Sequence, residues 1–211
     1  MSFPEPVRVL RTIRGMPTSD GAGVRLTRVI GGPTLPDLDP FLLLDEFGTD
    51  RAEDYIAGFP EHPHRGFETV TYMLDGRMRH RDNHGNEGLL TPGSVQWMTA
   101  GRGLVHSEMP EQESGQMRGF QLWVNLRGQD KSAAPGYQSI TKRQIPVVTL
   151  PDDGGSLRVI AGRYEETTGP AHSYSPLNVW DIALHQGSHL TLSQPEGWST
   201  ALVVLEGSVT V

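Results

Sequence analysis

Short apolar runs, each closed by a glycine or proline turn, constrain the fold of this chain most. Strand-like runs lie at residues 24–30, 69–74, 94–98, 119–126 and 157–161. Turn signals separate them at Gly31-Gly32, Asp75-Gly76, Pro92-Gly93 and Asp153-Gly154-Gly155. This spacing is typical of a β-sandwich or β-barrel, and no segment has the apolar period of an amphipathic helix. The sequence therefore predicts an all-β protein.

Length, charge and composition exclude several classes of protein. The chain has 211 residues, enough for one large or two small domains. Its formal charge of −7 and its lack of a basic block disfavour direct binding to nucleic acid. No apolar run approaches the roughly 18 residues that span a bilayer, and the N-terminal stretch lacks the apolar core of a secretion signal. Because the chain also has no cysteine, we expect a cytoplasmic protein that does not associate with membranes.

One segment of the first half recurs in the second half. GFETVTYMLDGRM at residues 66–78 aligns without a gap with GWSTALVVLEGSV at residues 197–209, at an offset of 131. We expect each copy to form the same strand and turn. At this offset the second half has serine and proline where the first half has His62 and His64. Any chemistry that depends on these histidines is therefore confined to the first half.

A polar stretch at residues 127–144 is poor in aliphatic side chains and is expected to connect the two halves. We place an N-terminal domain at residues 1–130 and a C-terminal domain at residues 131–211. The second domain is expected to be incomplete, because the counterpart of His106 would lie beyond the last residue. Alternatively, residues 7–13 complete its sheet.

Two histidine pairings suggest a metal site in the first domain. His62 and His64 lie two residues apart in EHPHRGFETV, and alternate residues of a strand share one face about 6.6 Å apart. Two imidazoles at this spacing can hold one ion, and by the same alternation Glu68 is expected on their face. A second pair, His106 and Glu108, follows a glycine-rich turn. The two pairs meet only if distant strands face each other across a barrel.

The other histidines have simpler interpretations. We expect His80 and His84 to be solvated in a polar hairpin, and His172, His185 and His189 to be structural. Even the pair at residues 62 and 64, taken alone, is more often a surface feature than a ligand pair.

The donor types limit the choice of metal. Without cysteine, any ion must be held by histidine and carboxylate, a set that suits Fe(II) and also Mn, Ni or Cu. Zn would bind comparably but would not carry out oxygen chemistry. We expect one divalent ion, most simply Fe(II), and its release below about pH 6, where histidine becomes protonated.

Four motifs in order resemble the pirin family of bicupins. They are DPFLLLDEFG at residues 39–48, GFPEHPHRGFETVTYMLDG at 58–76, TPGSVQWMTAGRGLVHSEMP at 91–110 and GFQLWVNL at 119–126. The resemblance implies two tandem cupin domains, each a double-stranded β-helix barrel, of which the second is degenerate. It also implies a single metal in the first barrel, held by His62, His64, His106 and Glu108. The general cupin pattern would use Glu68 instead, and the pirin resemblance favours Glu108.

The resemblance also implies a function. Members of the family resemble quercetin 2,3-dioxygenases, which open a flavonol ring with O₂, and some are described as metal-dependent redox sensors that bind protein partners. In an enzyme, Glu108 or Glu68 would accept the proton of the flavonol. Gln121, two residues before Trp123, is expected to face the pocket.

Overall fold

The computed structural model describes residues 8–211, so Val7 of the N-terminal segment considered above lies outside the described residues. Seven strands form the larger sheet: β1 (Met16–Asp20), β2 (Val24–Ile30), β3 (Phe41–Thr49), β5 (Phe67–Asp75), β8 (Val95–Thr99), β10 (Met117–Asn125) and β11 (Gly136–Ile140). Their order is β1-β2-β3-β10-β5-β8-β11, and every neighbouring pair is antiparallel.

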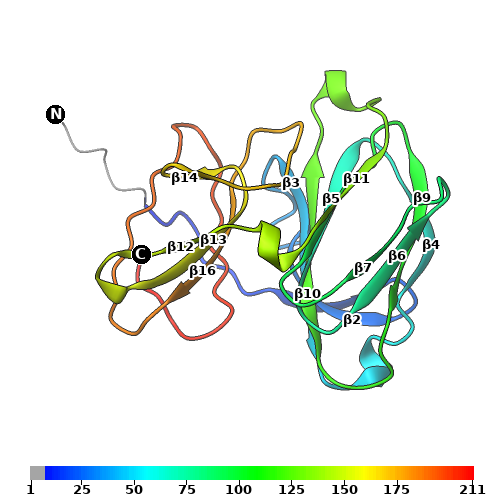
Figure 1. Cartoon of the computed structure of the whole chain (residues 1–211), viewed down its shortest axis with the longest axis horizontal. Coiled ribbons are helices and arrows are strands. Elements are labelled where there is room, and N and C mark those ends of the chain that lie inside the picture. The colour runs from blue at the N-terminus through cyan, green and yellow to red at the C-terminus, as the bar shows by residue number, and fades with distance from the viewer. Residues whose placement is uncertain (1–7) are drawn as a thin grey trace.

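Four further strands form the opposite wall of a barrel. They are β4 (Phe59–His64), β6 (Met78–Asp82), β7 (Glu87–Leu90) and β9 (Leu104–Pro110), in the order β4-β9-β6-β7. In Figure 1 this wall and the larger sheet enclose one end of the molecule. Strands distant in sequence therefore become neighbours, as the cupin prediction requires, and the prediction of an all-β fold is confirmed.

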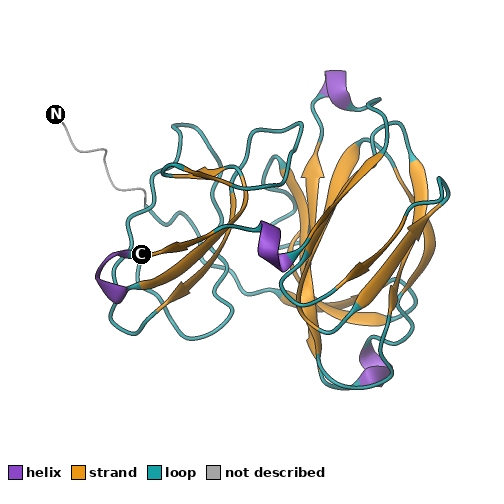
Figure 2. Cartoon of the chain, viewed as in Figure 1, coloured by secondary structure: helices purple, strands orange, loops and turns teal. Residues whose placement is uncertain are grey.

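The second half contains a smaller sheet beside the barrel (Figures 1 and 2). Its strands are β12 (Val147–Thr149), β13 (Gly155–Ala161) and β16 (Val179–Leu184), in that order, with a two-stranded ribbon of β14 (Arg163–Tyr164) and β15 (Thr167–Thr168). The described helices are short 3₁₀ turns: η1 (Ala52–Asp54), η2 (Gly128–Asp130), η3 (Lys142–Gln144) and η4 (Pro151–Asp153). None of the helices in residues 8–211 is long and apolar enough to cross a membrane.

The larger sheet is buried on both faces. Side chains along its central strands point alternately towards the second half and into the barrel. Val70, Trp97 and Val124 are at most 3% exposed and pack with Ile145 and Ile160, which follow the barrel in sequence. Burying one such side chain stabilises the fold by about 1.5–3 kcal/mol. The intervening residues of the same strands point into the barrel and are available to line a site.

The strand predictions for the first half are confirmed, whereas one prediction for the second half is wrong. Each of the five apolar runs named from the sequence overlaps one strand, β2, β5, β8, β10 or β13, and extends beyond it by at most one residue. Residues 197–209, the copy of β5, form no strand. A strand needs neighbours to pair with, and β5 has β10 and β8 on its two edges, whereas no described strand pairs with the copy.

The polar connection also differs from the expectation. Residues 127–144 contain β11, which pairs with β8 and adds a strand to the larger sheet. A polar composition does not prevent pairing at a sheet edge, where one side of the strand meets solvent. Residues 8–13 form no strand. The domain division near residue 130 stays a prediction.

Candidate metal centre

The two histidine pairings of the sequence meet on neighbouring strands. His62 and His64 lie on β4, and His106 lies on β9 directly opposite His62. Partners opposite each other in an antiparallel pair point to the same side of the sheet, and so do residues two apart on one strand. All three imidazoles therefore face the barrel interior.

The three rings converge closely enough to share one ion. One ring nitrogen from each histidine lies within 4.8 Å of the others, and no further His, Asp or Glu of residues 8–211 joins this group. The Nε2 atoms of His62 and His106 are 3.1 Å apart. His64 and His106 are 7% and 1% exposed, while His62 is partly exposed and forms the accessible side of the cluster.

Hydrogen bonding and burial keep these imidazoles in the ligand form. Nδ1 of His62 donates to the Pro60 carbonyl oxygen at 2.7 Å, so its Nε2 carries the lone pair and directs it towards Nε2 of His106. Burial, followed by repulsion from the neighbouring histidines, lowers the pKa of both His64 and His106 from 6.5 to about 3. Nε2 of His64 and Nδ1 of His106 are buried without a hydrogen-bond partner. Neutral, clustered imidazoles with an unpartnered buried nitrogen fit a divalent metal ion.

Glu108 lies on the same inner face of β9, two residues beyond His106. Its carboxylate is 3% exposed and accepts a hydrogen bond of 2.6 Å from the Thr71 hydroxyl. Burial raises the pKa of Glu108, and the Thr71 hydrogen bond partly opposes this rise. The carboxylate stands beside the histidines but outside the 4.8 Å group.

The expectation that Glu68 shares the face of the histidines is wrong. Gly66, at a φ of +80°, makes the turn between β4 and β5, which belong to different sheets, so the alternation does not continue across it. Glu68 is fully buried and accepts hydrogen bonds from the hydroxyls of Thr99, at 2.8 Å, and Ser173. It therefore joins the barrel to the second half.

Aromatic rings form an apolar wall beside the histidines. The His64 ring lies 5.1 Å from Phe67 and 5.3 Å from Trp123, measured between centroids. Phe67 and Trp123 themselves lie 4.7 Å apart. Gln121 is on the same face of β10 as Trp123 and contacts Thr71, so its expected position inside the barrel agrees with the structure.

His80 is not solvated, contrary to the expectation, whereas His84 is exposed. His80 is 2% exposed on the inner face of β6, opposite Glu108, and its ring stacks on Tyr137 at 5.0 Å. A side chain at Gly88 would collide with the His80 ring, so this glycine makes the burial possible. The signal was present in the sequence, because the alternation of Met78 and His80 on a strand predicts that both point inward.

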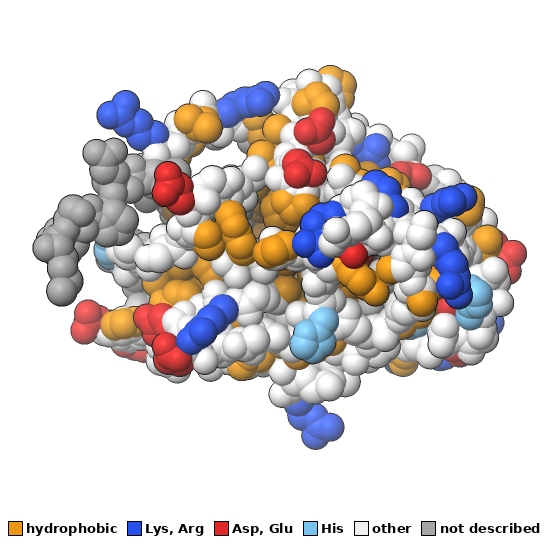
Figure 3. All heavy atoms as spheres, turned by 90° about the horizontal axis from the view of Figure 1, so that it is seen from above, with side chains coloured by type: hydrophobic (Ala, Val, Ile, Leu, Met, Phe, Trp, Pro, Cys, Tyr) orange, Lys and Arg blue, Asp and Glu red, His pale blue; other side chains and the backbone are white. Residues whose placement is uncertain are grey.

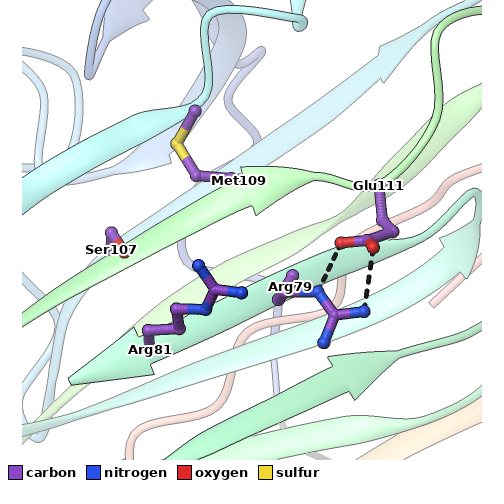
Figure 4. A pocket seen from close by; sticks show the side chains of 5 residues that line it. All are labelled: Arg79, Arg81, Ser107, Met109 and Glu111. Carbon is purple, nitrogen blue, oxygen red and sulfur yellow. Dashed lines mark hydrogen bonds and ion pairs between the residues drawn. The ribbon is translucent and has the colours of Figure 1, made fainter.

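The outer face of β6 and β9 is a different environment. A pocket of about 240 Å³ lies there. Figure 4 shows the side chains that line it, those of Arg79, Arg81, Ser107, Met109 and Glu111. Arg79 donates two hydrogen bonds, of 2.6 and 2.8 Å, to the Glu111 carboxylate. Ser107 stands between His106 and Glu108 in sequence and points to this outer side, so the pocket lies across the strand from the histidines.

Comparisons with known proteins agree with this geometry. A family model described as Pirin matches residues 23–124. The chain is 54% identical over 209 residues to a pirin-like protein of Caulobacter vibrioides, covering 98% of this chain and 75% of the relative. It is 42% identical over 203 residues to pirin of Mus musculus, covering 96% and 68%.

Solved structures give the same answer. A quercetin 2,3-dioxygenase from Acinetobacter baumannii superposes with a TM-score of 0.71 at 38% identity, covering 80% of this chain and 61% of that one. A pirin from Escherichia coli, solved in complex with nickel(II), shares the fold at a TM-score of 0.53 and 21% identity, covering 71% and 69%. By the extent and identity of these matches, the chain belongs to the pirin family.

Proposed function

We propose that this protein is a metal-dependent dioxygenase that opens the ring of quercetin or a similar flavonol with O₂. The observation that carries the proposal is the convergence of three imidazoles, from His62, His64 and His106, beside the buried carboxylate of Glu108. The 38% identical quercetin 2,3-dioxygenase structure supports the same reaction class. Absence of cysteine supports a cytoplasmic location.

The proposed ligands are His62, His64, His106 and Glu108, holding one divalent ion, with Fe(II) as first choice. The histidine nitrogens suit Fe(II), Mn(II), Ni(II) and Cu(II) alike. When bound, such an ion would supply a redox-active centre with open positions for O₂ and the substrate.

Glu108 is the proposed proton acceptor. A flavonol hydroxyl that loses its proton to the carboxylate becomes electron-rich and reacts more readily with O₂. Burial raises the pKa of Glu108, which makes its ionised form a stronger base than an exposed glutamate. Glu68 has no such role in this proposal, because it faces the second half.

Phe67 and Trp123 are proposed to receive the aromatic substrate. Their rings adjoin His64 and present apolar surface next to the ligand atoms. Aromatic rings prefer offset or edge contacts with such a wall, and the wall excludes water from the reacting atoms.

The test is O₂ consumption with quercetin. Protein loaded separately with Fe(II), Mn(II), Ni(II) or Cu(II) should consume O₂ in proportion to the flavonol lost, and ¹⁸O₂ should place label in the product. A Glu108→Gln variant that retains metal should lose most of this activity. Metal binding without O₂ consumption under any of the four ions would contradict the enzyme and favour the alternative, a metal-dependent regulatory protein that binds a partner.

A further inference from the structure

The hydroxyl of Thr71 links two groups across the barrel. Thr71 Oγ1 lies 2.6 Å from Oε1 of Glu108 and 2.7 Å from Oε1 of Gln121. Thr71 and Gln121 are opposite each other on β5 and β10 of the larger sheet, whereas Glu108 lies on β9 of the facing sheet. The contact is buried, because Thr71 and Glu108 are 1% and 3% exposed.

Proton counting sets the direction of these hydrogen bonds. A threonine hydroxyl has one proton, so it cannot donate to two oxygens at once. A carboxylate that binds a metal is ionised and accepts only, so Thr71 must donate to Glu108. Thr71 then accepts from Gln121, which requires the Gln121 amide to present its nitrogen in place of its oxygen. The two ends of an amide have nearly the same shape, so this rotation changes no packing. It gives up the longer hydrogen bond of 3.5 Å from Gln121 Nε2 to Glu108 Oε2 and keeps the shorter contact with Thr71.

We propose that Thr71 and Gln121 are positioning residues that hold Glu108 through a directed hydrogen-bond relay, from the Gln121 amide to the Thr71 hydroxyl to Glu108 Oε1. The inference rests on the proposed role of Glu108. The relay occupies Oε1, limits rotation of the carboxylate and leaves Oε2 for the metal or a substrate proton. Groups that orient metal ligands in this way typically contribute 10–100-fold to metal affinity, as an order of magnitude.

The chain offers matched variants for a test. Thr71→Val removes the donor at nearly constant volume, whereas Thr71→Ser keeps it. Thr69→Val is the control, because Thr69 is 1% exposed on the same face of β5 but is paired with Trp123 instead of Gln121. Gln121→Met removes the amide while keeping side-chain length.

The measurement is the Ni(II) dissociation constant, by competition with a chelator, together with the electron paramagnetic resonance spectrum of Cu(II)-loaded protein. Thr71→Val should weaken Ni(II) binding by about 10–100-fold and shift the Cu(II) spectrum. Thr71→Ser and Thr69→Val should remain close to the wild type. Gln121→Met should weaken binding in the wild-type background and have no further effect in Thr71→Val, because it acts through Thr71.

Three outcomes would overturn the relay. The first is an unchanged Ni(II) affinity in Thr71→Val. The second is a higher affinity in that variant, which would show that Thr71 holds Glu108 away from the ion. The third is an equal effect of Gln121→Met on Ni(II) affinity in the wild-type and Thr71→Val backgrounds. If Thr71→Val does not fold, Thr71→Ser and Gln121→Met still decide, since a strong loss in the former or none in the latter contradicts the relay. Metal affinity is measured without flavonol, so failure of the dioxygenase reaction is a separate result.

Discussion

The two halves of the molecule begin alike and then diverge. In the first half β1, β2 and β3 lie side by side, and in the second half β12, β13 and β16 repeat this antiparallel order. β2 and β13 have the same length and start 131 residues apart, at the offset of the sequence repeat. The beginning of the cupin arrangement is therefore present twice.

The divergence begins at the next strand. In the first half β10 pairs with the free edge of β3 and carries β5 on its other side. Within the part of the chain that the structure describes, β16 has no strand on its outer edge, and the copy of β5 forms none. Hydrophobic side chains remain at the surface as a result, among them Leu202 at 57% and Val204 at 47% exposure, and Figure 3 shows such side chains over this half of the molecule.

The difference shows what the proposed metal centre needs around it. Strands β4 and β9 carry the proposed histidine ligands and form one wall, but Thr71 and Gln121, which hydrogen-bond to Glu108, come from the opposite sheet. Two histidines on one strand do not suffice without the strands that face them. In the described part of the second half, the positions aligned with His62 and His64 are serine and proline, and no strands face the small sheet as β4 and β9 face the larger one.

The largest expected difference between the halves is at the aligned positions His62 and Ser193. His62→Ala removes one of three converging imidazoles, the proposed ligands, and should lower metal affinity by more than about 100-fold, beyond the usual effect of a supporting residue. Ser193→Ala, at an exposed position, should leave it unchanged. Metal content after dialysis, measured by mass spectrometry, tests both. Metal retained in His62→Ala would remove His62 from the proposed ligand set.

The second prediction concerns the pH dependence of stability in the first half, which holds His64 and His106. Because the pKa values of His64 and His106 are near 3 when folded and 6.5 when unfolded, the unfolded chain binds more protons between these values. The stability contributed by the two neutral imidazoles is complete above about pH 6.5 and declines as the pH falls towards 3. Chelator-treated protein should thus unfold at lower denaturant concentration as pH falls, and more steeply than a His64→Gln/His106→Gln variant.

If the denaturant midpoint fell equally with pH in the wild type and in the His64→Gln/His106→Gln variant, the two histidines would not be the cause of the pH dependence. The expectation of metal release below about pH 6 stays a prediction, because protons and a bound ion compete for the same histidine nitrogens.

Local sequence patterns predicted the strands and the histidine cluster of the first half well. Alternation along a strand depends only on the strand itself, so β2, β5, β8 and β10 were identified, and His62, His64 and His106 were placed together with the aid of the family resemblance. The ligand role of Glu108 stays a prediction, because the carboxylate lies beside the histidine group and outside it.

The failures involve contacts between distant segments. Glu68 points away from the histidines because the turn at Gly66 carries the chain from one sheet to the other. His80 is buried because Tyr137, 57 residues later, covers its ring. Thr71 gave no signal at all, since a threonine in a strand is ordinary and its partner Glu108 is 37 residues away. The repeat at residues 197–209 predicted a strand from composition, but pairing needs neighbours that composition does not supply.

The smallest expected effect is that of Val204→Ala, within the repeated segment itself. Met73 and Val204 occupy the same position in the two copies, yet Met73 is fully buried and Val204 is 47% exposed. Met73→Ala should lower the free energy of unfolding by about 2–5 kcal/mol, because it leaves a cavity between the sheets. Val204→Ala should change it by less than about 0.5 kcal/mol, as for most exposed positions. Denaturant unfolding followed by tryptophan fluorescence measures both. A cost for Val204→Ala similar to that for Met73→Ala would mean that the second copy packs as a strand in solution, and that the two halves are more alike than their pairing suggests.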